Sequence, residues 1–314
     1  MTRILTNVSE SVSAPTGQRG PSSRHAGSSQ HPASSPRGPS PGRGPSPRPS
    51  ARLVPFVFGV TGRRELPGTV LVRLLEDLGL TAGAARAVIA RLRAEGNLAG
   101  TARGRGVDYR VDGILVRGFE RVRTGGPGVE WSGAFHALIY HVPEADRAFR
   151  DQLRRVAFLS GFGLLSHGIL ISLFDRFGEL DALLAGAPAD ARIYRCRLAM
   201  SEAEASRAAR EAWDLDELGS AMRAHLEVLQ AAVSPSTGPE RVDGEALRYF
   251  AELTGPALGA LLRAPSLPAV LRPPGWPVDE LRAAIEAVEL RHFPPVRRYV
   301  ERLLDPADPV DPER

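Results

Sequence analysis

The chain has 314 residues, of which 43% are hydrophobic, so it is long enough for two or three domains with sizeable cores. Its single cysteine, Cys196, excludes a disulfide framework and a thiolate metal cluster, and it fits a reducing cytoplasm. No apolar run approaches the roughly 20 residues that cross a bilayer, so we expect no membrane partner.

The basic charge of this chain is concentrated at its N-terminal end. All 40 basic residues are arginines. Residues 51–123 hold 13 of them against 7 acidic residues, whereas residues 124–314 hold 21 against 28. This distribution is typical of an N-terminal part that meets phosphate. The alternative is a solvated basic surface without a partner.

Four segments are predicted to have no regular secondary structure. Residues 1–50 are rich in Ser, Pro, Gly and Arg and cannot bury enough apolar surface to fold, so we expect a disordered tail. That tail would add electrostatic attraction to nucleic acid or have no function of its own. Residues 306–314 are predicted to be a second disordered tail, Thr124–Glu130 a linker, and Ser234–Pro239 a loop.

Two helices are predicted at the start of the basic part. Leu53–Val60 (LVPFVFGV) is an apolar run that fits a first helix. Pro67 suits the first turn of a second helix, which Gly79 ends. The buried face of this second helix is predicted to be Val70, Leu71, Leu74, Leu75 and Leu78.

A third helix is predicted to begin after Thr81, whose hydroxyl can cap the first turn, and to run to about Glu95, before Gly96. Its apolar stripe is Ala85, Val88, Ile89 and Leu92. The opposite face carries Gly83, Ala87 and Ala90, flanked by Arg86 and Arg91. Small residues between arginines suit a helix that lies close against an anionic partner.

A basic β-hairpin is predicted to follow this helix. Its strands are Leu98–Ala102 and Asp108–Val111, and the turn between them contains Arg103-Gly104-Arg105-Gly106. A helix followed by a basic hairpin is the recognition half of a winged helix-turn-helix. Residues 51–123 are therefore predicted to be a winged helix domain that binds double-stranded DNA.

The expected DNA contacts follow from this arrangement. The third helix would enter the major groove, where Arg86 and Arg91 are best placed for phosphates or a guanine edge. Arg103 and Arg105 on the wing would contact the backbone or the minor groove, and Tyr109 would brace the wing. The full expected set is Thr81, Arg86, Arg91, Arg93, Arg103, Arg105, Tyr109 and Arg110.

Residues 124–200 are predicted to form a central ferredoxin-like α+β domain. The pattern indicates strands at Trp131–Val142, Ile169–Phe174 and Ala191–Leu198, a helix at Ala145–Leu159, and a turn at Gly161-Phe162-Gly163. A metal nuclease of this class needs a carboxylate at the end of the first strand, but that strand ends Tyr140-His141-Val142. We therefore expect a scaffold or dimer interface, with no catalytic residue, metal or cofactor.

Residues 201–305 are predicted to form an all-helical C-terminal domain. One helix is indicated by Leu215, Leu218, Met222, Leu226 and Leu229, and another by Tyr249 to Leu262. A third is indicated by Leu281, Ile285 and Val288, and a last one by Val296 to Leu304. The fold class expected for the whole chain is α+β multidomain.

This order of parts resembles the PaaX-like transcriptional regulators, the phenylacetate-degradation repressor family, over roughly residues 53–305. In the N-terminal part the resemblance rests on AARAVIARLRAEG (84–96) and GRGVDYRV (104–111). In the central part it rests on Trp131, Val142-Pro143, Arg154, Gly161-Phe162-Gly163 and Gly168. The most specific match is LRAPSLPAVLRPPGWPVDEL (262–281), through Arg263, Pro265, Leu267-Pro268, Pro274, Trp276 and Pro277.

The resemblance implies a repressor that acts as a homodimer on a palindromic operator and responds to an aryl-CoA such as phenylacetyl-CoA. Arg263 and Trp276 are the candidate ligand contacts in the matching segment. Where the family usually has a polar HDYR-type stretch, this chain has Gly255, Pro256, Ala257 and Leu258. The effector of this chain is therefore either the family's own, a different ligand or none.

Two other interpretations stay open. The first is a protein–protein adaptor that uses its winged helix as a binding surface, which the basic wing argues against. The second is an enzyme with an active site in the C-terminal helices, where the residues are mostly Ala, Leu and Pro. A salt-dependent affinity for duplex DNA separates the regulator from the adaptor, and turnover of an acyl-CoA would reveal the enzyme.

Overall fold

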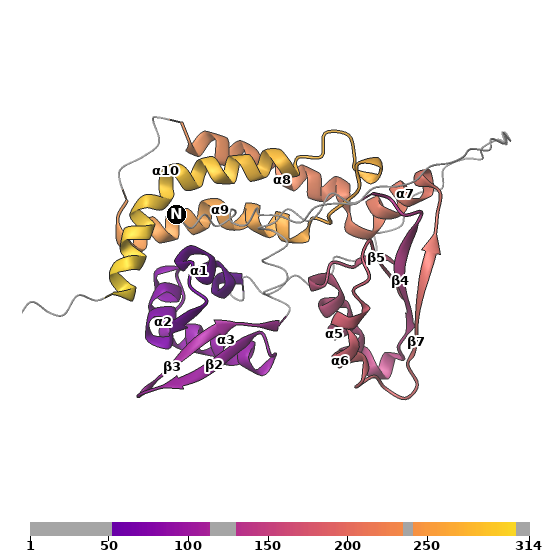
Figure 1. The fold of residues 1–314 in the computed structure, drawn as a ribbon, viewed down its shortest axis with the longest axis horizontal. Helices are drawn as coiled ribbons and strands as arrows, with labels where there is room; N and C mark the ends of the chain where they lie inside the picture. Colours follow the sequence, from indigo (N-terminus) through magenta and orange to yellow (C-terminus); the bar gives the residue numbers. More distant parts are fainter. Residues whose placement is uncertain (1–51, 114–129, 235–240, 306–314) are drawn as a thin grey trace, which may run out of the picture.

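The computed structural model describes residues 52–113, 130–234 and 241–305. The predicted tails at 1–50 and 306–314, nearly all of the linker at 124–130 and most of the loop at 234–239 lie outside these residues. Figure 1 shows a small N-terminal unit beneath a layer of long helices, with a sheet-containing central part beside them.

The N-terminal unit contains three helices and a three-stranded antiparallel sheet in the order β1-β3-β2. Its elements are α1 (Leu53–Thr61), β1 (Glu65–Pro67), α2 (Gly68–Asp77), α3 (Ala82–Ala94), β2 (Leu98–Arg103) and β3 (Gly106–Val111). Strand β1 was not predicted, because three residues with one buried side chain, Leu66, are too few for an alternating pattern to be recognised in the sequence. The three helices and the hairpin are confirmed close to their predicted bounds.

Prolines in this unit occupy helix starts. Pro55 lies in the first turn of α1, where the missing N–H has no partner within the helix. Pro67, expected inside α2, instead precedes it as the N-cap and ends β1. Helix α1 ends at Gly62, whose φ of 61° is a left-handed conformation that glycine adopts without steric cost.

The central part contains a four-stranded antiparallel sheet in the order β5-β6-β4-β7. Its elements are β4 (Ala134–His141), α5 (Arg147–Leu159), β5 (Gly163–Ser166), β6 (Ile169–Ser172), α6 (Asp181–Leu184) and β7 (Arg192–Ala199). This is the β–α–β–β–α–β connectivity of a ferredoxin-like sheet, with a second helix of only four residues.

Strand β5 corrects the predicted turn at Gly161-Phe162-Gly163. Gly161 takes a φ of 90° and turns the chain, whereas Phe162 is buried and Gly163 already begins the strand. The first predicted strand also starts later, because Trp131 precedes β4 and stacks on Phe135 with 4.7 Å between ring centroids.

Helix α7 (Glu202–Trp213) packs against one face of the central sheet, and α5 covers the other. The face that α7 presents to the sheet consists of small residues: Ala205, Ala208, Ala209 and Ala212. These let the helix approach closely, and a Cβ added at Gly163 would lie 2.7 Å from the Trp213 ring. Helix α7 is therefore part of the central packing unit, although its helical pattern suggested the C-terminal domain.

The C-terminal part contains α8 (Leu215–Ala232), α9 (Asp243–Arg263) and α10 (Val278–Leu304), which pack on one another. The last two predicted helices are one continuous helix, α10, although Pro294 and Pro295 lie inside it. Figure 1 shows α10 changing direction along its length, and internal prolines are a common cause of such bends.

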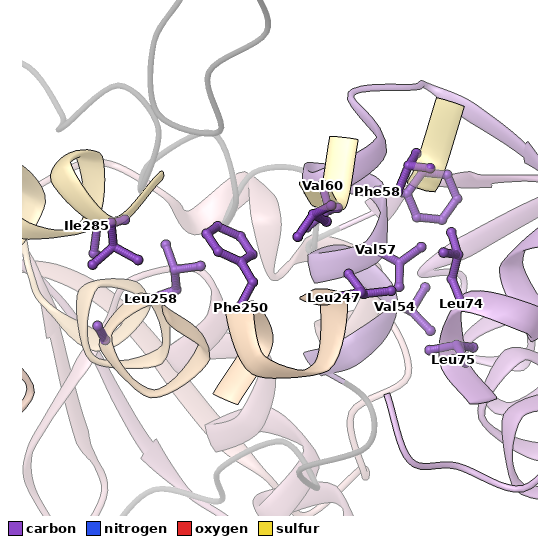
Figure 2. Close-up of a cluster of buried hydrophobic side chains, with 14 of the residues drawn as sticks. Val54, Val57, Phe58, Val60, Leu74, Leu75, Leu247, Phe250, Leu258 and Ile285 are labelled. Atoms are coloured by element: carbon purple, nitrogen blue, oxygen red, sulfur yellow. The ribbon is translucent and has the colours of Figure 1, made fainter. Parts of the chain in front are cut away.

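The N-terminal unit and the C-terminal helices share one hydrophobic core. Figure 2 shows Leu247 and Phe250 of α9 between Val57 of α1 and Ile285 of α10. The Phe250 ring lies 6.2 Å from Phe56 of α1 and 5.5 Å from Phe293 of α10, centroid to centroid. The two parts are therefore coupled by packing, although the whole central part lies between them in the sequence.

A buried polar contact joins the same two parts. The Tyr299 hydroxyl of α10 donates to a carboxylate oxygen of Asp77 at the end of α2, at 2.5 Å. Burial, and then this hydrogen bond, raise the pKa of Tyr299. Arg248 of α9 donates to the Asp77 carbonyl at 2.8 Å. The C-terminal end of α2 is thus held by both α9 and α10.

None of the helices in the described part of the chain is both long and apolar enough to cross a membrane.

Candidate nucleic-acid interface

Helix α3 buries one face and exposes the other. The Thr81 hydroxyl accepts a hydrogen bond from the Ala84 N–H at 3.2 Å, which is the predicted N-cap. The buried residues of α3 are the predicted stripe of Ala85, Val88, Ile89 and Leu92. The exposed residues are Gly83, Arg86, Ala87, Ala90, Arg93 and Ala94. The outward face is thus nearly flat, with Arg86 and Arg93 as its long side chains.

The sequence predicts Arg91 on this exposed face, but the structure does not place it there. Its side chain is half-buried, and its Nη2 atom is inaccessible to solvent. A helix turns 100° per residue, so a position one residue past Ala90 already rotates toward the core. Arg93, three residues beyond Ala90, returns to the exposed face and takes the place expected for Arg91.

The β2–β3 hairpin ends in a two-residue turn, Gly104-Arg105, which is shorter than the predicted four. Gly104 has a φ of 58°, a conformation that suits glycine at the first position of such a loop. Arg103 is tied back to Asp108 by an ion pair at 3.0 Å. Within the described residues Arg105 makes no ion pair, so its charge at the tip is free for a partner.

Tyr109 connects the hairpin to α2 and α3. The Arg93 guanidinium lies over its ring, 5.9 Å from the centroid. A Cβ at Gly68, at the start of α2, would lie 2.9 Å from Cε2 of Tyr109, and one at Gly100 would lie 3.2 Å from Cε1. The bracing position expected of Tyr109 thus depends on two glycines that sequence reasoning missed, because only tertiary contact reveals close approach.

Two further contacts flank this surface. Arg110 is exposed on β3 and lies 3.7 Å from Asp112, an exposed pair that contributes little stability. Glu95, the C-cap of α3, pairs with Arg155 of α5 at 3.3 Å. The C-terminal end of α3 is therefore linked to the central part.

The two candidate ligand contacts, Trp276 and Arg263, differ in burial and in what they contact. Trp276 is half-buried, and a Cβ at Gly219 of α8 would lie 3.3 Å from its ring, so Trp276 packs on the α8 backbone. Arg263 ends α9 and is exposed. Burial lowers the pKa of both Arg52 and His225, and the charge of Arg263 lowers each of them further.

The central motif residues have structural roles. Arg154 of α5 donates to the Tyr140 hydroxyl of β4 at 2.7 Å, which ties the helix to the sheet. Gly168 turns the chain between β5 and β6 with a φ of 85°. No three His, Cys, Asp or Glu side chains in the described ranges gather as metal ligands would.

Two family models match parts of this chain. A family model described as PaaX-like protein matches residues 59–113, and the PaaX protein central Cas2-like domain matches residues 128–212. A solved structure of an uncharacterized protein, Rv0674 from Mycobacterium tuberculosis, is 26% identical over 74% of this chain and 90% of that chain, with a TM-score of 0.43. No curated protein matches.

The two family matches show that the chain belongs to the PaaX-like family, whose members are generally transcriptional regulators rather than enzymes. The resemblance predicted from the sequence is thereby confirmed for the N-terminal and central parts, which the two models match. The match to the central model continues to residue 212, which includes the α7 helix that packs on the sheet.

Proposed function

We propose that this protein is a sequence-specific DNA-binding transcriptional regulator, a repressor that responds to a small aromatic catabolite or its CoA ester. In this proposal the N-terminal unit is a winged helix-turn-helix. Helix α3 is its recognition helix and the β2–β3 hairpin its wing. The protein binds its operator as a homodimer in the cytoplasm.

The observation that carries the proposal is the exposed face of α3. Arg86 and Arg93 project from a surface otherwise made of glycine and alanine, so the helix backbone can approach a groove closely. Arg105 at the hairpin tip lies beyond the strand pair and reaches a phosphate backbone or minor groove in the same docking. Small side chains on α3 leave few direct base contacts, so DNA shape and half-site spacing supply much of the specificity.

The test is an anisotropy titration of the full chain against the DNA upstream of its own gene, with random duplex as competitor and with or without phenylacetyl-CoA. Competitor-resistant binding that the CoA ester releases is the expected result. Binding that the ester leaves unchanged would keep the regulator and replace the effector. Affinity no higher than for random duplex would favour the adaptor.

Arg86→Ala is expected to weaken binding to the operator by about 1–3 kcal/mol while changing affinity for random duplex much less, because a base-edge contact exists only on the correct sequence. The measurement is the ratio of the two dissociation constants at one salt concentration. Arg207→Ala, an exposed arginine on α7, is the matched control for loss of one charge. Equal losses on both duplexes would contradict a base-reading role for Arg86.

Arg105→Ala is expected to weaken all duplexes about equally, because a hairpin-tip arginine contacts phosphate rather than bases. The slope of log affinity against log salt should fall by about 1, as one fewer counterion is released. Titrations at four or five salt concentrations measure this slope. Arg103→Ala should lower it less, because Asp108 already partners Arg103. A slope unchanged from wild type would remove Arg105 from the interface.

A further inference from the structure

Three basic residues, one at the start of the N-terminal unit and two on the C-terminal helices, are candidates for a shared anion site. Arg52 immediately precedes α1, His225 belongs to α8, and Arg263 ends α9. The Nη1 atom of Arg52 lies 3.1 Å from the position that a Cβ of Gly259 would occupy. Gly259 and Arg263 are one helical turn apart on the same face, about 6 Å along the axis. The Arg52 guanidinium therefore lies beside the face of α9 that carries Arg263.

These like charges repel one another. Burial lowers the pKa of Arg52, and the charge of Arg263 lowers it further. The pKa of His225 is lowered by the same two causes in the same order. Across residues 52–113, 130–234 and 241–305, no carboxylate forms an ion pair with any of the three. By contrast, Arg73 has Asp77 and Arg302 has Asp243 as partners.

The two arginines of the cluster differ in exposure: Arg52 is half-buried, whereas Arg263 is exposed. Gly259 has no side chain where the Arg52 guanidinium lies. One turn earlier, a Cβ added at Gly255 would meet no atom within 4 Å. Because Arg263 is exposed, an anion in solvent can reach its guanidinium group. Arginine guanidinium groups are suited to bidentate contacts with phosphate or carboxylate oxygens.

We propose that Arg52, His225 and Arg263 bind the phosphate or carboxylate group of a small-molecule ligand. The bound anion would offset the repulsion and hold the start of α1 against α8 and α9. Val54 and Val57 of α1 lie in the shared core, so this contact biases the position of the N-terminal unit relative to the helices. This regulatory consequence rests on the proposed function, whereas anion binding itself does not require DNA.

Thermal unfolding of the full chain tests the site directly. Inorganic pyrophosphate and citrate are each titrated against sodium chloride at matched ionic strength. The midpoint temperature should rise by about 3 °C at tenfold excess over the dissociation constant. A rise with pyrophosphate alone identifies a phosphate ligand, and one with citrate alone identifies a carboxylate ligand.

Variants separate the site from general ionic effects. Arg52→Gln and Arg263→Gln should each lose most of the anion-induced rise. Each should also unfold at a higher temperature than wild type in anion-free buffer, because one repelling charge is gone. Arg207→Gln on α7 should keep the wild-type rise. Gly259→Ala, which displaces the Arg52 guanidinium without changing charge, should weaken the response partially.

Three outcomes would overturn the proposal. These are no rise for wild type with either anion, an equal rise in the variants, and variants that keep the rise but lose affinity for random duplex DNA. The last would make the cluster a DNA contact. Because the assay contains no DNA, a positive result stands even if operator binding fails. Anisotropy with pyrophosphate present then reports whether the site is coupled to DNA binding.

Discussion

Phe250→Ala is expected to lower the free energy of unfolding by about 4 kcal/mol, because a fully buried aromatic side chain is replaced by a cavity. The Phe250 ring contacts Phe56 of α1 and Phe293 of α10, so the cavity would open where the N-terminal unit meets the C-terminal helices. The loss should therefore weaken the association of the two parts as well as α9 itself.

Urea unfolding followed by far-ultraviolet circular dichroism measures this loss. The unfolding midpoint followed by tryptophan fluorescence should shift less, because two of the three tryptophans, Trp131 and Trp213, lie against the central sheet. Leu290→Ala, at a position that is 73% exposed on α10, is the control and should change stability by no more than about 0.5 kcal/mol. A loss below 1 kcal/mol for Phe250→Ala would show that α1 and α10 do not depend on this ring.

Gly168→Ala is expected to destabilise the central part by about 3 kcal/mol, for two reasons that add. A φ of 85° costs an alanine about 1–2 kcal/mol. In addition, the new Cβ would lie 2.6 Å from the Tyr140 carbonyl oxygen, which is backbone and cannot move aside as a side chain would. The Tyr140 N–H also donates to the Gly168 carbonyl, so displacing the turn strains the pairing of β4 with β6.

Gly133→Ala is a closely matched control. Gly133 has a φ of 82° in the same part of the chain, but an added Cβ would meet nothing within 4 Å. The Gly133→Ala variant should therefore be destabilised only by the conformational cost, about 1–2 kcal/mol. Fluorescence-detected urea unfolding of both variants measures the difference. Equal losses would mean that the turn at Gly168 shifts freely and that the contact with Tyr140 is not restrictive.

Much of this fold follows from local patterns in the sequence. Helix α3 was predicted from its apolar spacing, the Thr81 cap and Gly96, and the structure places the cap and the buried stripe as expected. The hairpin followed from two short strands around a glycine turn. These features depend on residues within a few positions of one another, which is why a single sequence reveals them.

Short or continuous elements were harder to predict. Strand β1 has three residues, and β5 has four and follows a glycine, so neither carries a periodic signal. The apolar pattern predicts separate helices before and after Pro294 and Pro295, but α10 continues through both prolines. Val288, Glu289 and Val296, on either side of the prolines, are buried, and this tertiary packing outweighs the local cost of proline.

The candidate interface shows the same division. The sequence by itself determined that arginines and small residues share the surface of α3, and that an arginine lies at the hairpin tip. Only the tertiary structure decided that Arg93 rather than Arg91 faces outward. It also decided that Asp108 forms an ion pair with Arg103, and that Gly68 and Gly100 leave space for the Tyr109 ring. It further decided that α1 shares a core with α9 and α10 and that the Arg52 guanidinium lies against Gly259 of α9. Helical periodicity and caps are set by neighbours along the chain, whereas burial and close approach are set by residues far apart in sequence.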